Sequence, residues 1–153
     1  MNEHTTIEGY KIYVFTNAIP DDICESWILR FRKDTDNFVG YNRELSTEIF
    51  TLLKNHIDFP FPVLDHQGST SFVRLKKPIY PHLDIVYGKE THKVAFYLNE
   101  VEGGGTEFQN GSDWILIEAH KGTVVIFDIR IRHRGQQTQE EKVKYVMGIR
   151  VCV

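Results

Sequence analysis

The sequence predicts a mainly β fold, a barrel or jelly roll of short antiparallel strands that follows two helices. From residue 70 onward, runs of β-branched and aromatic residues alternate with glycine-rich or polar turns, which is typical of such folds. Before residue 70, apolar residues recur at helical spacing in two segments. The 153 residues, 41% hydrophobic and 25% charged, have the size and composition of one globular domain. We therefore expect a single domain over residues 1–153, in which residues 1–69 supply a strand and supporting helices and residues 70–153 the β core.

Local signals place the elements of the N-terminal part. The β-branched and aromatic run from Tyr10 to Phe15 predicts a strand. Asp21 and Asp22 put acidic side chains at the positive end of a helix dipole, so a helix is predicted to begin there. Its apolar positions are Ile23, Cys24, Trp27, Ile28 and Phe31. A second helix is expected after Gly40, and His56 should end it in a structural or dipole-capping role. The apolar positions of that helix are Leu45, Ile49, Leu52 and Leu53.

The C-terminal part contains five strand-like runs, separated by turns. The runs are Ser71–Leu75, Lys93–Leu98, Trp114–Glu118, Thr123–Ile129 and Val143–Val153. The predicted turns include Gly103–Gly105, Asn110–Asp113 and Lys121–Gly122. In the last run, one set of alternate residues is wholly apolar or aromatic and can pack under the helices. The opposite face, which includes Lys144 and Arg150, then points into the barrel.

Composition excludes several classes of protein. The net charge of −3 gives no general attraction to nucleic acid or to membrane surfaces. Two cysteines far apart in sequence, Cys24 and Cys152, do not make a disulfide framework and are consistent with a reducing compartment. The first eight residues are polar, and no apolar run reaches 18 residues. We expect a soluble cytoplasmic protein with no membrane partner.

A metal site is predicted from the segment Pro81-His82-Leu83-Asp84. On an extended chain, His82 and Asp84 point the same way and can hold two sides of a metal ion. His133 is the best third ligand, because it follows an apolar strand that could bring it beside His82. Two histidines and one carboxylate on one face leave three open metal positions, as in non-haem iron oxygenases. The competing histidines lie in the tail or in polar loops and turns: His4, His66, His92 and His120.

The position of Lys144 has two possible explanations. A buried cation is unfavourable unless it is paired, so an anionic ligand inside the barrel would explain it. Alternatively, Lys144 pairs with a protein carboxylate such as Asp128 or Glu107, or it lies in water at a strand end.

Five motifs in order resemble the prolyl 4-hydroxylase-like branch of the 2-oxoglutarate/Fe(II) oxygenases. They are His82-Leu83-Asp84, Phe96-Tyr97-Leu98-Asn99, Gly103-Gly104-Gly105-Thr106-Glu107-Phe108, Lys121 to Phe127 ahead of His133, and Lys144-Tyr145-Val146. The helices and the first strand also follow the family's order. The resemblance implies a double-stranded β-helix, a cupin-like jelly roll, behind two N-terminal supporting helices.

The resemblance also implies a role for each site residue. His82, Asp84 and His133 would bind Fe(II) and form the catalytic centre. Lys144 would pair with the distal carboxylate of 2-oxoglutarate, and Tyr97 would donate a hydrogen bond to it. Tyr97 otherwise reads as a core tyrosine. Thr106 would support the same pocket or else cap the glycine run.

The activity that this resemblance implies is hydroxylation of an unactivated C–H bond, coupled to oxidative decarboxylation of 2-oxoglutarate to succinate. O2 is the second cosubstrate, with ascorbate as an accessory reductant. The preferred substrate is a prolyl residue in a peptide or protein. The alternatives are a free amino acid or other small molecule, or a non-catalytic metal-binding jelly-roll module.

Two arginine features stay open. Arg150 faces inward, where it could bind substrate, bind the oxoacid or neutralise Asp84. The spacing of Lys144 and Arg150 matches two arginines in the related nucleic-acid demethylases, but no basic nucleotide-binding lid lies upstream, so a nucleic-acid partner is not favoured. If their run is extended, Arg130, Arg132 and Arg134 share the face opposite His133. They would then bind an anionic partner or, as we favour, form weak surface ion pairs.

Overall fold

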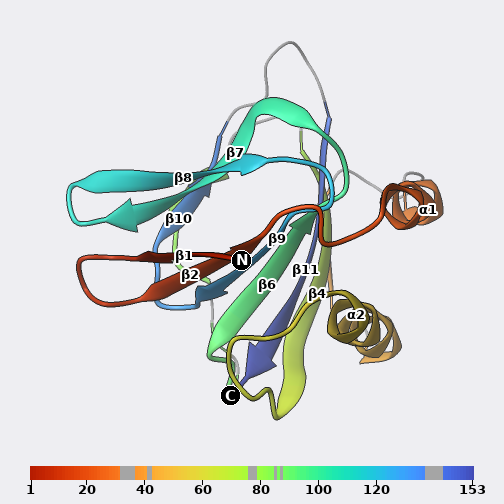
Figure 1. Ribbon diagram of the computed structural model, residues 1–153, viewed down its shortest axis with the longest axis horizontal. Helices are drawn as coiled ribbons and strands as arrows, with labels where there is room; N and C mark the ends of the chain where they lie inside the picture. Colours follow the sequence, from red (N-terminus) through yellow and green to blue (C-terminus); the bar gives the residue numbers. More distant parts are fainter. Residues whose placement is uncertain (32–36, 41–42, 76–78, 85, 87, 137–142) are drawn as a thin grey trace.

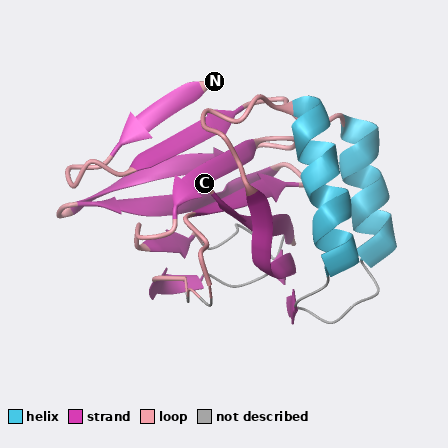
Figure 2. Ribbon diagram, turned by 90° about the horizontal axis from the view of Figure 1, so that it is seen from below, coloured by secondary structure: helices cyan, strands magenta, loops and turns pink. Residues whose placement is uncertain are grey.

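The computed structural model describes residues 1–31, 37–40, 43–75, 79–84, 86, 88–136 and 143–153. Side chains are described for all of these except 31, 37–40, 67–75 and 79. Within this part of the chain, two antiparallel sheets face each other and two helices lie on one side of them (Figures 1 and 2). Neither described helix has the length and apolar content needed to span a bilayer.

The larger sheet has seven strands in the order β1-β2-β9-β6-β11-β4-β3. In that order they are Asn2–Thr5, Lys11–Phe15, Val124–Asp128, His92–Tyr97, Lys144–Cys152, Asp65–Leu75 and Asn37–Gly40. The smaller sheet has the order β5-β10-β7-β8. Its strands are Ile79–His82, His133–Gly135, Val101–Asn110 and Asp113–Ala119. The predicted mainly β jelly roll behind two N-terminal helices is confirmed.

The two helices form where the sequence predicted them. The helix α1 spans Asp21–Phe31, with both aspartates in its first turn, and α2 spans Arg43–His56. The Nδ1 of His56 donates to the carbonyl of Leu52 over 2.8 Å, so the histidine closes the last turn of α2 as expected. Both helices lie along the outer face of the larger sheet (Figure 2).

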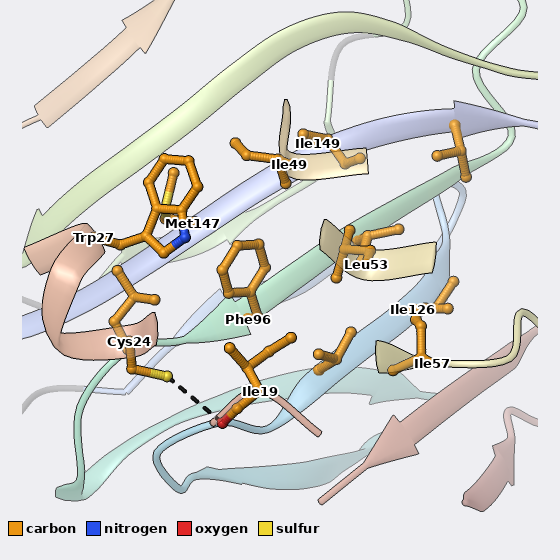
Figure 3. Close-up of a cluster of buried hydrophobic side chains, with 14 of the residues drawn as sticks. Ile19, Cys24, Trp27, Ile49, Leu53, Ile57, Phe96, Ile126, Met147 and Ile149 are labelled. Atoms are coloured by element: carbon orange, nitrogen blue, oxygen red, sulfur yellow. Dashed lines mark hydrogen bonds between the residues drawn. The ribbon is translucent and has the colours of Figure 1, made fainter. Parts of the chain in front are cut away.

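A hydrophobic core fills the space between the helices and the larger sheet (Figure 3). Ile49 and Leu53 of α2 are fully buried against residues such as Phe96 of β6 and Met147 of β11. Cys24 of α1 is also fully buried, and burial raises the pKa of its thiol to about 11, so it acts as a small apolar residue.

Truncating the buried face of α2 should destabilise the whole fold. Leu53→Ala removes a side chain with no solvent exposure, and we expect it to lower the free energy of unfolding by about 2–5 kcal/mol. Leu29→Ala, at a side chain that is 58% exposed on α1, should change it by less than about 1 kcal/mol. Urea denaturation of the two variants tests this. Equal effects would mean that α2 does not pack on the sheet as described.

A second core lies on the opposite face of the larger sheet, between the two sheets. Because side chains alternate along a strand, Val94 and Phe96 of β6 face the helices, whereas Tyr97 faces the smaller sheet. β11 alternates in the same way: Met147 and Ile149 pack under the helices, and Val146 packs into the inner core. The predicted two-faced character of this strand is therefore confirmed.

The structure differs from the sequence prediction in several elements. The short strands β1 and β3 were not predicted, and β4 begins at Asp65 and runs across residues 69 and 70. The predicted turn at Gly103–Gly105 is wrong, because these glycines lie within β7. A side chain at Gly105 would place its Cβ 2.4 Å from the carbonyl oxygen of Ile117 on β8, so glycine here permits close strand approach rather than a turn.

Candidate metal centre

The structure brings His82, Asp84 and His133 together, with one ligand atom of each within 4.8 Å of the others. His82 ends β5 and His133 begins β10, and these residues are register partners in the smaller sheet. Their imidazole centroids are 4.4 Å apart. Asp84 lies just past the end of β5, so it reaches the site from a loop rather than from the extended strand that the sequence suggested.

Backbone hydrogen bonds orient both imidazoles. The Nδ1 of His82 donates to the carbonyl of Tyr80 over 2.8 Å, and the Nδ1 of His133 donates to the carbonyl of Ile131 over 3.1 Å. Donation from Nδ1 leaves the lone pair of each Nε2 available as a metal ligand. These Nε2 atoms lie 3.7 and 3.8 Å from the carboxylate oxygens of Asp84, a spacing that leaves room for an ion between them.

The carboxylate of Asp84 is held ionised by cations from the larger sheet. The Nζ of Lys93 lies 3.3 Å from Oδ2, and an Nη of Arg150 lies 3.9 Å from Oδ1. Burial raises the pKa of Asp84, but Lys93, His133 and Arg150 lower it more, so the net pKa is below its ordinary value. The Oδ2 atom is nevertheless buried without a hydrogen-bond partner among the described residues. An ionised, incompletely satisfied oxygen beside two oriented histidines fits a divalent cation.

The lowered pKa of His133 predicts that the stability of the metal-free protein depends on pH. Burial lowers the pKa of His133 from 6.5 to about 4, although Asp84 opposes this shift. Between these two pH values the unfolded chain binds more protons than the folded one, so stability should fall as pH is lowered from 6.5 to 4, by up to about 3 kcal/mol.

Thermal or urea unfolding across this pH range measures the effect. His133→Leu should flatten the slope, whereas His4→Leu, on the outer strand β1, should keep it. An unchanged slope in His133→Leu would contradict the assignment.

A cavity of about 90 Å³ adjoins the metal centre between the two sheets. His82 and His133 line one end of it, and Lys144, Tyr97 and Thr106 also line it. The hydroxyls of Tyr97 and Thr106 share a hydrogen bond of 2.6 Å. Apolar side chains cover much of the remaining wall: Ala95, Phe108, Val125, Phe127 and Val146.

Lys144 is only 3% exposed and projects into this cavity. Its Nζ donates to the carbonyl of Gly105 over 3.4 Å and lies 5.2 Å from the ring centroid of Tyr97. The carboxylates proposed as its partners are engaged elsewhere, since Asp128 pairs with Arg130 and Glu107 pairs with Arg134. Burial lowers the pKa of Lys144 to about 8. The lysine is therefore a buried cation with no carboxylate in contact among the described side chains.

The run that holds the three alternating arginines is not extended, so the condition for one shared arginine face is not met. Two of them form ion pairs, as in the favoured interpretation: Arg130 with Asp128 and Arg134 with Glu107. Residues 129 and 130 form a turn and residue 131 a bend, so the chain is not extended here. The guanidinium of Arg130 donates two hydrogen bonds to Asp128 and lies over the ring of Tyr10, while Arg134 lies over Trp114. Arg132 is exposed.

Arg150 and Lys93 complete the charge distribution around the metal centre. Arg150 lies between two buried carboxylates, 3.9 Å from Asp84 and 3.9 Å from Glu90. This position favours the third reading of Arg150, as a partner that neutralises Asp84. Lys93 also lines the cavity, but it was not predicted as a site residue. It lies on the same strand face as Ala95 and Tyr97, because side chains alternate along a strand.

Known proteins resemble this chain in structure but do not match it in sequence. No protein-family model matches the chain, and no curated protein matches it in sequence. A prolyl-4-hydroxylase from Pseudomonas putida is 13% identical with a TM-score of 0.64, covering 93% of this chain and 92% of the other. The viral collagen prolyl hydroxylase of Paramecium bursaria Chlorella virus-1 is 15% identical with a TM-score of 0.67, covering 100% and 95%. The chain has the prolyl hydroxylase fold.

That fold is not confined to prolyl hydroxylases. Iron-bound HygX from Streptomyces hygroscopicus is 12% identical with a TM-score of 0.69, covering 92% of this chain and 81% of that one. The prolyl hydroxylase fold predicted from the five motifs is thus confirmed, while the substrate has to be inferred from the site itself.

Proposed function

We propose that the chain is a 2-oxoglutarate- and iron(II)-dependent oxygenase that hydroxylates an unactivated C–H bond. The observation that carries the proposal is one cavity lined both by the two histidines of a His-Asp-His group and by the buried Lys144. A metal-binding module needs the first feature but has no use for the second. A dicarboxylate cosubstrate that reaches the metal uses both.

The residues present fit the metal and the cosubstrate. His82, Asp84 and His133 would hold iron and leave positions open, because the structure offers three protein ligands. Lys144 would pair with the distal carboxylate of 2-oxoglutarate, and Tyr97 would donate a hydrogen bond to it. Thr106 would support this arrangement by donating its own hydroxyl proton to the oxygen of Tyr97. Two solved relatives in fold support this assignment: the viral hydroxylase as a 2OG complex, and HygX with iron bound.

Bound iron would supply the activation of O2, coupled to oxidative decarboxylation of 2-oxoglutarate to succinate. The chain itself contributes ligation, orientation and exclusion of water. Asp84 stays ionised because cations surround it, and His133 stays neutral at pH 7 because it is buried. Phe108 and Phe127 form part of an apolar wall that limits water beside the reacting centre. Ascorbate would act only as an accessory reductant.

The first candidate substrate is a prolyl residue in a peptide or protein. It is supported by the fold of the prolyl hydroxylases, one of which, from Trichoplax adhaerens, is in complex with a peptide fragment of hypoxia inducible factor. A small molecule is the second candidate, and it is supported by SnoK, a carbocyclase from nogalamycin biosynthesis with the same fold.

We also infer one oxygenase domain over residues 1–153, because β2 and β11 belong to the same sheet. The free cysteines Cys24 and Cys152 are compatible with a cytoplasmic location.

Succinate formation tests the proposed activity. The purified protein with Fe(II), 2-oxoglutarate and O2 should form succinate slowly even without a substrate, and His82→Ala should abolish it. His120→Ala is a matched control, because this exposed histidine also contacts two carboxylates, Glu100 and Glu118, yet lies outside the cavity. The absence of succinate together with the absence of 2-oxoglutarate binding would leave a non-catalytic metal-binding module as the better reading.

A further inference from the structure

The cavity has a lysine near each end of its floor. The floor is formed by β6 and β11, whose register pairs Tyr97 with Val146, Ala95 with Gly148, and Lys93 with Arg150. Lys93, Ala95 and Tyr97 point to the same face, because side chains alternate along a strand. Four residues of extended chain span roughly 13 Å, so Lys93 stands well apart from the Lys144–Tyr97 end. The middle pair consists of two small residues, Ala95 and Gly148, which leave the space between the two ends open.

Lys93 lies at the metal end of this floor. It lines the cavity, its side chain is 23% exposed, and its Nζ is 3.3 Å from Oδ2 of Asp84. This contact is an ion pair near the limit of hydrogen-bond distance, and its geometry does not satisfy Oδ2 as an acceptor. In the metal-free protein, Lys93 therefore interacts electrostatically with Asp84. A bound metal would compete with Lys93 for the negative charge of that carboxylate.

The charges at this end do not balance once the metal and the cosubstrate are bound. The two positive charges of iron would be offset by Asp84 and by the carboxylate of 2-oxoglutarate beside the metal. Glu90, whose side chain is 2% exposed, offsets Arg150. The distal carboxylate is assigned to Lys144. Among the described side chains, the charge of Lys93 is then left without a negative charge of its own in a partly buried site, which is unfavourable.

We propose that Lys93 binds an acid group of the substrate, so that the substrate is a carboxylate-bearing molecule whose charge sits beside the metal. This inference rests on the proposed oxygenase function and narrows it. A prolyl residue inside a peptide chain carries no negative charge, whereas a free amino acid or a residue with a free C-terminal carboxylate does. The acid group would hold a neighbouring C–H bond toward the metal, which makes Lys93 a specificity-determining residue.

Matched acids and amides test the charge requirement. The protein is loaded with Zn2+, which is diamagnetic and redox-inert, and saturated with 2-oxoglutarate. Binding is then measured by ligand-observed NMR for L-proline and L-prolinamide, N-acetyl-L-proline and its amide, and acetate and acetamide. We expect at least one acid to bind tenfold or more tightly than its amide. Lys93→Met should reduce that preference below threefold, Lys93→Arg should preserve it, and the distant charge change Lys11→Met should leave it intact.

The outcomes separate this inference from the proposed function. If no acid is preferred over its amide, or if the preference survives Lys93→Met, the role of Lys93 is overturned. If Lys93→Met weakens 2-oxoglutarate binding as much as acid binding, Lys93 serves the cosubstrate and the inference is also overturned. If the wild-type metal complex does not bind 2-oxoglutarate, the proposed function itself fails. Folding of Lys93→Met is checked independently by its circular dichroism spectrum and a cooperative thermal transition.

Discussion

Asp84→Ala should abolish binding of divalent metal. Asp84 supplies the only anionic ligand of the described triad, and its loss would leave two neutral imidazoles facing the Lys93 ammonium. Removing a residue that merely orients a ligand costs roughly 10–100-fold in metal affinity, so the loss of this ligand should cost more than roughly 100-fold. Calorimetric titration with Mn2+ or Co2+ measures the change.

The control for this experiment is Asp128→Ala, which removes a buried carboxylate of the same protein. Asp128 is the last residue of the inner strand β9, where it pairs with Arg130 and does not line the cavity. It should keep metal affinity within threefold of wild type. Metal binding by Asp84→Ala at nearly wild-type strength would show that the ion, if it binds, is held elsewhere.

Lys144→Met should abolish binding of 2-oxoglutarate and, in the ligand-free protein, increase stability. Removing one partner of a buried charge pair costs about 3–5 kcal/mol, which corresponds to a loss of affinity of more than roughly 100-fold. Without the ligand, the same lysine is a buried cation, and methionine is an apolar side chain of similar length. Isothermal titration with the metal-loaded variant and urea denaturation of the metal-free variant measure the two effects.

The stability gain has a defined pH dependence. The pKa of Lys144 falls from 10.5 in the unfolded chain to about 8 in the folded one, because burial disfavours the charged amine. Between these pH values the unfolded chain binds more protons, so wild-type stability should rise with pH across the window. Below pH 8 the full penalty applies, about 3 kcal/mol, and Lys144→Met should remove both the penalty and the slope. A variant that loses stability at pH 7 would contradict the assignment of Lys144 as a ligand-free buried charge.

The features that could be predicted from the sequence depend on short-range patterns. Alternation along β11 correctly separated the apolar face of Met147 and Ile149 from the face of Lys144, because strand parity is a local property. The acidic start of α1 and the closing histidine of α2 are likewise local signals. The five motifs added the jelly-roll fold, which no local pattern contains.

The features that failed depend on contacts between distant segments. Gly105 looked like a turn residue because only the approach of β8 reveals why a side chain is excluded there. Arg134 looked like part of an arginine face because a turn after β9 was not evident from the alternating residues. Lys93 was not assigned to the site, because its partner, Asp84, lies in the loop that follows β5 of the other sheet. Alternation along the strand could indicate which way the Lys93 side chain points, but not which residue contacts it there.

The position of β11 between β6 and β4 has a consequence for the speed of folding. Its two neighbours pair with it across long stretches of chain: β4 spans Asp65–Leu75 and β6 spans His92–Tyr97, whereas β11 spans Lys144–Cys152. Pairings of such high sequence separation lose much chain entropy before they gain contacts, so topologies dominated by them fold in milliseconds to seconds. The same strand carries both the core residue Met147 and the pocket residue Lys144. A chain that has not yet formed this pairing therefore lacks its core and its proposed anion site together. Ligands should then act on the native protein by slowing its unfolding rather than by hastening its formation.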